Sequence, residues 1–391
     1  MTSRAEAIGG PIDTPATRAL AALTGLAGIL IAWRIVAGLG ATTALNDGYP
    51  LGLWIAFDVV TGTAIACGGY AVAILVYILN KGRYHPLVRP ALLTSALGYS
   101  LAGFSVVIDV GRWWNVWKLP IYFWHWNFNS ALLEVALCIM AYVVVLWIEL
   151  SPAFFERWED SSILPLRRLS RTALPVLKKA SLFIIALGLL LPTMHQSSLG
   201  TLMLLAGSRL HPLWNTPFLP LLFLISCVSM GYAGVVFEST LASTLFGRRP
   251  DTKMLASLAA AIVPLQLGFV VLRLGDLAWQ GRLNLLFAGD GRGVLAAIEF
   301  VMFLAPVVML ASAAQRADLG RLFRAALVMI AAGALFRFDT YLVAFVPGPQ
   351  WAYFPSVPEL LITVGLVAGE VLAYVLIVRI FPILVTEEAV R

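Results

Sequence analysis

Residues 86–110 read PLVRPALLTSALGYSLAGFSVVIDV, a mostly apolar run that is long enough to cross a membrane. Such a run predicts a helix, because a helix pairs its backbone groups within one segment and leaves none exposed to lipid. Tyr99 lies inside this run and Asp109 lies near its end. Ionisable groups are costly inside a membrane and often mark a functional path, so these two side chains are the first candidates for a site.

The whole sequence has the same apolar character. Of its 391 residues, 60% are hydrophobic and 12% are charged, and the mean hydropathy is +0.88. A soluble domain has about twice that charged share. The net charge of +6 does not indicate a nucleic-acid partner, because Lys and Arg form short clusters between apolar runs. The composition therefore predicts an all-α polytopic membrane protein.

Ten runs reach the length of a transmembrane helix, about 20 residues. They cover residues 18–39, 51–79, 86–110, 128–150, 176–193, 219–246, 254–274, 293–314, 319–345 and 358–384. We expect one integral membrane domain over residues 1–391. Its parts are a first helix at 18–39, a four-helix bundle at 51–193, a second four-helix bundle at 219–345 and a last helix at 358–384. Gly68 and Gly69 predict a kink or a close-packing point in the second run.

The orientation follows from the basic residues. If the N-terminus lies in the cytoplasm, the inner side holds 19 of the 27 Lys and Arg residues. Cytoplasmic loops are enriched in these residues, so both termini are expected inside. Several outer basic residues have an acid close by in the sequence, which predicts internal ion pairs. These pairs are Asp109 with Arg112, Arg273 with Asp276 and Arg337 with Asp339.

Polar groups on four of the predicted helices lie at a similar depth, near the outer face. With Tyr99 as its floor, we expect one pocket formed by Asp58, Asp109, Arg112, Glu134 and His195. Asn127 lies seven residues before Glu134, on the same face of its run. A network that served stability alone would not need a titratable acid on three helices, so we prefer a functional pocket.

A quinone head group suits such a pocket. It requires hydrogen-bond partners at both carbonyl oxygens and groups that exchange two protons as two electrons move. Tyr, His and a membrane-shielded Glu can do both. The residues equally allow the site of a proton-coupled secondary transporter. A transporter is expected to carry polar residues at the midplane in both halves, whereas here the acids concentrate near one face.

Resident metal groups are not expected. The three cysteines, Cys67, Cys138 and Cys227, lie inside apolar runs without CxxC spacing, which argues against disulfides, zinc and iron–sulfur clusters. A b-type haem between helices usually needs two His ligands within the membrane. None of the four histidines lies in the middle of a run; they are His85, His125, His195 and His211. We therefore expect no haem in this protein, and a haem b cytochrome subunit remains an alternative.

An outer loop at residues 113–126 is crowded with aromatic side chains. Seven lie within it: Trp113, Trp114, Trp117, Tyr122, Phe123, Trp124 and Trp126. An aromatic belt at the membrane surface is one interpretation. Seven aromatics exceed what the anchoring of one helix pair needs, so a docking surface for a partner protein is the preferred one.

Seven stretches resemble a known family. They are 48–58 (GYPLGLWIAFD), 84–91 (YHPLVRPA), 98–100 (GYS), 108–112 (IDVGR), 192–198 (PTMHQSS), 287–290 (FAGD) and 353–355 (YFP). They are similar to the NrfD/PsrC family of polysulfide-reductase-type membrane subunits, and most of all to its HybB branch, the integral membrane subunits of nickel–iron hydrogenase 2.

The resemblance implies more than the residues show. It implies a subunit of the bacterial cytoplasmic membrane that binds menaquinone or ubiquinone near the outer face and carries no haem. Its electrons would come from a ferredoxin-like [4Fe–4S] subunit on the periplasmic side. That subunit would be fed by the large and small subunits of a nickel–iron hydrogenase. The protein would then be the membrane anchor and quinone-reactive subunit of a respiratory hydrogenase complex, and not catalytic for hydrogen itself.

The resemblance also suggests a role for each candidate residue. Tyr99 and His195 would be hydrogen-bond and proton partners of the quinone, near Asp58 and Asn127. Glu134 would relay protons, and Asp109 with Arg112 would form an organising ion pair. Glu238, about 30 Å along the sixth, inward-running run by helical rise, would be a relay nearer the cytoplasm.

The distribution of basic residues predicts that the C-terminus is cytoplasmic. A reporter enzyme that works only in the cytoplasm is expected to be active when fused after Arg391. Activity of an export-dependent reporter at the same position would reverse the orientation and move the predicted pocket to the other face.

Overall fold

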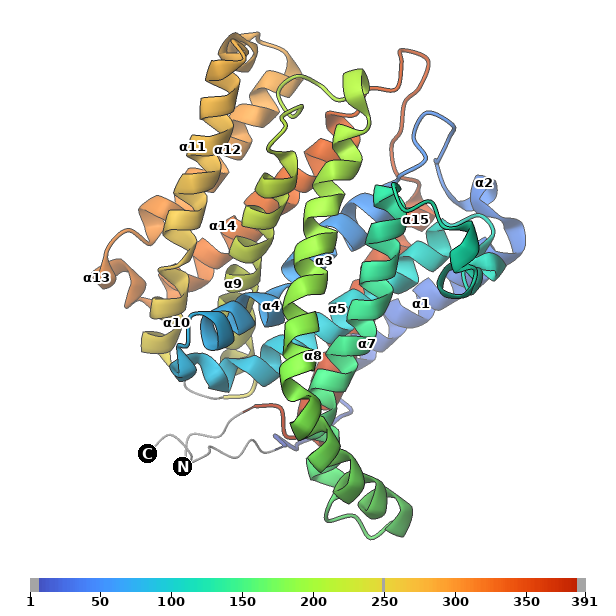
Figure 1. Cartoon of the computed structure of the whole chain (residues 1–391), viewed down its shortest axis with the longest axis vertical. Helices are drawn as coiled ribbons and strands as arrows, with labels where there is room; N and C mark the ends of the chain where they lie inside the picture. The colour runs from blue at the N-terminus through green and yellow to red at the C-terminus, as the bar shows by residue number, and fades with distance from the viewer. Residues whose placement is uncertain (1–6, 248–249, 385–391) are drawn as a thin grey trace.

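The computed structural model describes residues 7–247 and 250–384 and confirms an all-α polytopic membrane protein (Figure 1). It contains ten helices that are long and apolar enough to cross a membrane, as the sequence predicts. Within the described ranges there is no strand, only an isolated bridge between Leu210 and Phe345.

Six spans are single α-helices: α1 (Pro15–Ala37), α7 (Ala131–Trp158), α8 (Leu164–Leu204), α9 (Leu219–Leu245), α12 (Gly291–Met309) and α15 (Val357–Ile380). Four are composite: η1 (Trp54–Thr61) with α3 (Gly62–Ile65), α4 (Gly68–Ala73) and η2 (Ile74–Ile78); η3 (Gly82–Leu87) with α5 (Val88–Asp109); α10 (Thr252–Ala259) with α11 (Ile262–Trp279); and α14 (Leu319–Phe338) with η8 (Asp339–Val343). Short helices in the connections are α2 (Leu39–Thr42), η4 (Trp113–Asn115), α6 (Lys118–Ile121), η5 (Phe123–His125), η6 (Gly207–Arg209), η7 (Leu283–Phe287) and α13 (Ala313–Arg316).

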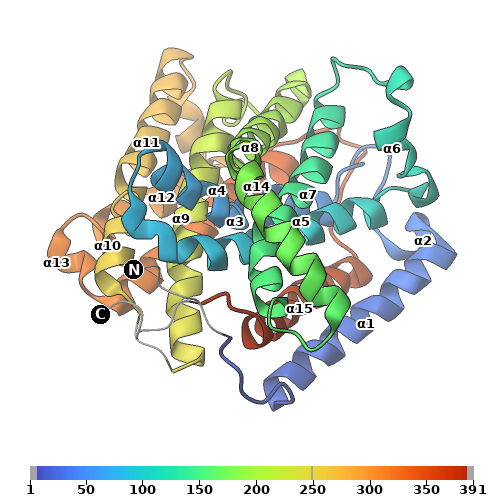
Figure 2. The same cartoon turned by 60° about the horizontal axis from the view of Figure 1, so that its bottom comes forward.

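The helices pack in two neighbouring sets with a flanking pair. In one set, α4 and α7 pack against α5, and α8 packs against α7; in the other, α9, α11, α12 and α14 contact one another. The two sets meet where α9 packs against α4 and α8. The flanking pair, α1 and α15, lies at the side of the molecule opposite α11 and α12 (Figures 1 and 2).

Helix α8 is much longer than the predicted run at 176–193. Its 41 residues correspond to about 62 Å, roughly twice the thickness of a hydrocarbon core. The polar first half of the helix, which includes Arg167 and Arg171, continues the apolar span without a break, and the α7–α8 hairpin projects beyond the other helices (Figure 1). Hydropathy located the apolar half of this helix and could not show that the helix continues beyond it.

The two described ends of the protein lie together. The backbone amides of Ile8 and Gly9 donate hydrogen bonds to the carbonyls of Val378 and Arg379, near the end of α15. The start of α1 and the end of α15 are therefore on one side of the molecule, as an even number of spans requires.

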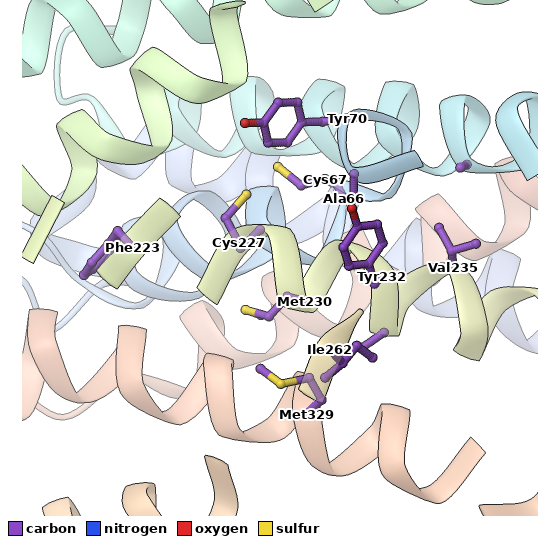
Figure 3. Packing of buried hydrophobic residues seen from close by; sticks show 14 of the residues in the cluster. Ala66, Cys67, Tyr70, Phe223, Cys227, Met230, Tyr232, Val235, Ile262 and Met329 are labelled. Atoms are coloured by element: carbon purple, nitrogen blue, oxygen red, sulfur yellow. The ribbon is translucent and has the colours of Figure 1, made fainter. Parts of the chain in front are cut away.

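The second span is interrupted between Ala66 and Cys67. Ser95 of α5 closes this interruption: its hydroxyl donates to the Ala66 carbonyl and accepts the Gly69 amide at 3.0 Å. The following turn lies against α9, where a Cβ on Gly231 would come within 2.7 Å of the Cys67 carbonyl oxygen. Figure 3 shows the result, with the thiols of Cys67 and Cys227 pointing toward one another in the core.

Small residues also bring the flanking helices together. A Cβ added at Gly365 of α15 would clash with the Cβ of Ala27 and would lie 2.6 Å from the carbonyl oxygen of Leu23, both on α1. Close approach at small residues is a main source of helix association in lipid. Gly365 is therefore the contact point that lets α1 pack on α15.

We expect Gly365→Leu to push α1 away from α15 and to lower the free energy of unfolding by about 1–3 kcal/mol, the usual range for overpacking. The measurement is the melting temperature in detergent. The matched control is Gly28→Leu, because no atom lies within 4 Å of a Cβ at Gly28. Equal melting temperatures for the two variants would contradict this account of the α1–α15 contact.

Candidate functional site

Tyr99 of α5 lies at the centre of a fully buried polar cluster. Its hydroxyl is 2.9 Å from Nε2 of His195 on α8 and 3.1 Å from Sγ of Cys67, at the interruption of the second span. The second, third and fifth spans thus converge on one hydroxyl. The structure brings together Tyr99 and His195, as the sequence analysis predicted.

Gln196 and Thr63 extend the cluster. The Gln196 amide nitrogen lies 2.9 Å from Nε2 of His195 and donates to the Thr63 hydroxyl at 3.0 Å. Tyr99 and Gln196 therefore compete for the same ring nitrogen, which forms one strong hydrogen bond at a time. Two buried atoms of the cluster, Nδ1 of His195 and Oε1 of Gln196, have no partner among the described residues. Buried polar atoms are rarely left without a partner, so these two are open positions for a ligand.

Aromatic rings enclose Tyr99. The ring of Tyr142, on α7, packs edge-on against the Tyr99 ring with 4.6 Å between centroids. Tyr70 lies nearby, with its hydroxyl 2.8 Å from that of Thr193, two residues before His195. These rings exclude water, which strengthens every electrostatic interaction within the cluster.

Arg337 supplies a buried positive charge beside the cluster. Its guanidinium donates to the backbone carbonyls of Val60 at 2.8 Å and Phe223 at 2.6 Å, and it lies over the Phe223 ring. No carboxylate forms an ion pair with it within residues 7–247 and 250–384. Val60 lies three residues before Thr63 of the cluster, so the charge is next to the cluster.

The predicted pocket is divided, because Asp58 belongs to a different polar group. Its Oδ2 accepts hydrogen bonds from Ser105 of α5 at 3.1 Å and from Thr363 of α15 at 3.5 Å. Asp58 lies in the π-helical η1, whose wider turn changes the direction of its side chains. The expectation that all the candidate residues share one pocket with Tyr99 is therefore wrong.

The prediction that Asp109 and Arg112 form an ion pair is also wrong. Spacing of three residues brings side chains together only within a helix, and α5 ends at Asp109, with Val110 extended. Arg112 is exposed, and no ion pair joins it to Asp109. Instead, Arg34 of α1 donates to the Val110 carbonyl at 2.8 Å, next to Asp109.

The other two predicted ion pairs do not form among the described residues either. Arg273 forms a buried ion pair with Glu299 of α12, whose second oxygen accepts the Trp214 indole N–H at 3.0 Å. Asp276 accepts a hydrogen bond from Gln280. Residues two apart on a helix, such as Arg337 and Asp339, do not face one another. Sequence proximity was therefore a poor guide to pairing in this protein.

The remaining candidates lie away from Tyr99. Glu134 is half-buried in the first turn of α7, and no hydrogen bond joins it to Tyr99 or His195. Asn127 is exposed in the preceding loop, where its side chain accepts the Asn129 amide at 3.1 Å. Glu238 of α9 accepts a hydrogen bond from the Tyr374 hydroxyl of α15 at 2.6 Å.

The sequence analysis did not assign Cys67, Gln196, Thr63 or Arg337 to the site. Gln196 lies within the PTMHQSS stretch and could have been found as the neighbour of His195. Cys67 precedes Gly68 and Gly69, a pair that marks the interruption in the second span. Arg337 was singled out only as a predicted partner of Asp339, and for Thr63 no signal was available, because both roles depend on how the spans are rotated against one another.

Comparisons with known proteins agree on one family. The model of the family described as "Polysulphide reductase, NrfD" matches residues 41–338. The sequence is 45% identical to the probable Ni/Fe-hydrogenase 2 b-type cytochrome subunit of Escherichia coli, over 98% of this protein and 96% of that one. It is 30% identical to the integral membrane subunit of menaquinone reductase from Nitratidesulfovibrio vulgaris, over 57% of this protein and 52% of that one. It is 27% identical to the C subunit of polysulfide reductase from Wolinella succinogenes, over 44% and 52%.

Proposed function

The protein belongs to the polysulphide reductase NrfD family, and we propose that it is the membrane anchor and quinone-reactive subunit of a respiratory hydrogenase complex. Its relatives are membrane subunits of redox complexes, and one of them is named as a subunit of a menaquinone reductase. The 45% identity over nearly the whole length supports a hydrogenase as the partner. We assign it to the bacterial cytoplasmic membrane, with menaquinone or ubiquinone as the cofactor.

The observation that carries the proposal is the 2.9 Å contact between the Tyr99 hydroxyl and His195 inside the membrane domain. A bound quinone supplies two-electron, two-proton chemistry. Tyr99 and His195 are a donor and an acceptor that can pass a proton between them. Nδ1 of His195 and Oε1 of Gln196 remain open for further hydrogen bonds. Arg337 favours negative charge that develops nearby, because its own charge has no carboxylate partner.

Access to the cluster comes from the lipid. Tyr99 and His195 are fully buried, so a head group reaches them only when neighbouring side chains move. An apolar groove of about 670 Å³ runs between α7 and α8, from Val143 to Phe155 on α7 and from Leu169 to Leu177 on α8. We assign the isoprenoid tail to this groove, because its lining is almost entirely apolar.

We assign proton transfer toward the outer face to Glu134. Glu134, Cys138 and Tyr142 are spaced four residues apart and therefore share one face of α7. By helical rise, Glu134 lies about 12 Å from Tyr142 along the axis. A proton from Tyr99 would need water molecules to cover this distance. Glu238 remains our candidate for a relay nearer the cytoplasm.

The aromatic loop at 113–126 is our candidate for the docking surface of the iron–sulfur subunit, which the hydrogenase subunits would in turn feed. Trp114, Trp117, Phe123 and Trp124 are each more than half exposed. Exposed aromatic clusters are typical of interface centres. The loop joins α5, which carries Tyr99, to α7, which carries Glu134, so an electron donor bound there would lie at the end of the two helices that carry these residues.

We propose that the protein binds no haem, although the E. coli relative has b-type cytochrome in its name. Nε2 of His195 is engaged by Tyr99 and Gln196, His85 and His125 are exposed, and His211 lies in the loop before α9. In that loop, burial and the charge of Arg292 lower the pKa of His211. No second histidine is therefore available to face His195 within the membrane.

The purified protein is expected to lack a Soret band and a reduced-minus-oxidised α peak. The measurement is an absorption spectrum with haem content normalised to protein. A stoichiometric b-type spectrum that disappears in His195→Ala or His125→Ala would refute the proposal.

The quinone assignment predicts that Tyr99→Phe, His195→Ala and Glu134→Gln reduce hydrogen-dependent quinone reduction by about a hundred- to ten-thousand-fold, the usual cost of losing a positioned acid or base. Reduction of an artificial dye with hydrogen is expected to continue, because that reaction bypasses the membrane subunit. Both rates are measured in membranes that contain the assembled complex.

The matched control is Tyr232→Phe, which removes the hydroxyl of a buried tyrosine on α9 outside the cluster (Figure 3). It is expected to leave both rates unchanged. Near-normal quinone reduction in all three variants would show that the quinone binds elsewhere. Loss of assembly in all three would show that these residues serve structure.

A further inference from the structure

A second set of polar side chains runs between α5 and α15, on a face of α5 that does not carry Tyr99. On α5 the positions are Thr94, Gly98, Ser105 and Asp109, with spacings of four, seven and four. On α15 they are Glu359, Thr363, Glu370 and Tyr374, with the same spacings. Such spacings keep residues on one face of a helix. The two helices are antiparallel spans in contact, so the positions match in four levels.

Contacts confirm this register at the two central levels. Ser105 and Thr363 both donate to Oδ2 of Asp58, which enters from η1. Seven residues further along each helix, Oε1 of Glu370 lies 3.2 Å from the point where a Cβ on Gly98 would be. The absence of a side chain at Gly98 therefore leaves room for the Glu370 carboxyl against α5.

The two ends of the row are also polar. At one end, the Tyr374 hydroxyl donates to Glu238 of α9 at 2.6 Å. At the other end, Asp109 is half-buried where α5 ends, beside the Arg34 cation. Its neighbour Glu359 is held by the Ala44 and Ser356 amides and by the Tyr353 hydroxyl. The fifteen steps of helical rise from Thr94 to Asp109 cover about 22 Å, most of the hydrocarbon thickness of about 30 Å.

Several atoms of the row have unused hydrogen-bonding capacity. Oδ1 of Asp58 and Oδ1 of Asp109 are buried without a partner, and no hydrogen bond to the Glu370 carboxyl is found in the part of the protein that the structure describes. Asp58 is only 1% exposed. A purely structural contact between α5 and α15 would be served better by apolar side chains, because unpaired acids are costly in a membrane.

We propose that this row conducts protons between the two faces of the membrane, as a path separate from the Tyr99 cluster. Each carboxyl takes up a proton on one oxygen and releases one from the other, and no electrons move. The steps between levels are about 6 to 10 Å by helical rise, so water molecules complete the path. Because α15 lies beyond residues 41–338, half of the row is contributed by a helix outside the region that the family model matches.

The test uses the full-length protein reconstituted into lipid vesicles that contain a pH-sensitive dye. A potassium diffusion potential drives protons inward, and the rate of acidification is measured. The wild-type protein is expected to conduct protons faster than protein-free vesicles. Asp58→Asn and Glu370→Gln are expected to lower this rate at least about tenfold, because an amide cannot exchange a proton as a carboxyl does. Glu370→Asp keeps the carboxyl and is expected to retain conduction.

Two controls separate this proposal from general damage and from the quinone site. Glu149→Gln makes the same chemical change at a half-buried acid on α7, outside the row, and is expected to leave the rate unchanged. Tyr99→Phe is likewise expected to conduct normally, whatever its effect on quinone reduction. If Glu370→Gln does not fold, Tyr374→Phe, which removes only the hydroxyl bonded to Glu238, replaces it and is expected to slow conduction. A wild-type rate equal to that of protein-free vesicles, or normal rates in the row variants, would overturn the proposal.

Discussion

One serine hydroxyl holds the second span in the conformation on which the buried site depends. A helix interrupted inside a membrane exposes carbonyls and amides that lipid cannot satisfy. Ser95 satisfies one of each, since it donates to the Ala66 carbonyl and accepts the Gly69 amide. The interruption directs Cys67 toward the Tyr99 hydroxyl, and Gly231 lets α9 pack directly on the Cys67 backbone. The interruption that Ser95 closes therefore accounts both for the contact between the two sets of helices and for the polar cluster.

Helix α5 separates two polar systems. One face presents Tyr99 to His195 and Cys67, and another presents Ser105 and Asp109 to η1 and α15. Because Gly98 and Tyr99 are consecutive on a helix, their directions differ by about 100°. The two systems therefore lie at a similar depth in the membrane. No hydrogen bond joins them among the described residues. In the two proposals, α5 contributes to redox chemistry through one face and to proton movement through another.

The sequence was sufficient for the architecture and for part of the site. Hydropathy identified ten spans because each must be apolar over a membrane thickness, and that requirement is local. Tyr99 was found because an ionisable group is conspicuous in an apolar run, and His195 because it lies just beyond the end of the run at 176–193. The partners of Asp109 and Arg273 were not found, because pairing depends on where a helix ends and how spans rotate against one another. These depend on packing between distant segments, as at Gly231 and Gly365, and no local pattern encodes them.

The two buried arginines of the second set show what the site requires. Arg273 has a carboxylate partner in Glu299, so its charge is neutralised within the bundle. Arg337, equally buried, is bonded only to carbonyl and hydroxyl oxygens among the described residues, so no carboxylate neutralises its charge beside the Tyr99 cluster. A buried cation without a counter-charge is expensive, and packing alone gives no reason to keep one. A ligand that gains negative charge beside Tyr99 would offset this cost, and a quinone that accepts electrons there is such a ligand. The placement of Arg337 thus favours an electron acceptor over a neutral structural role for the cluster.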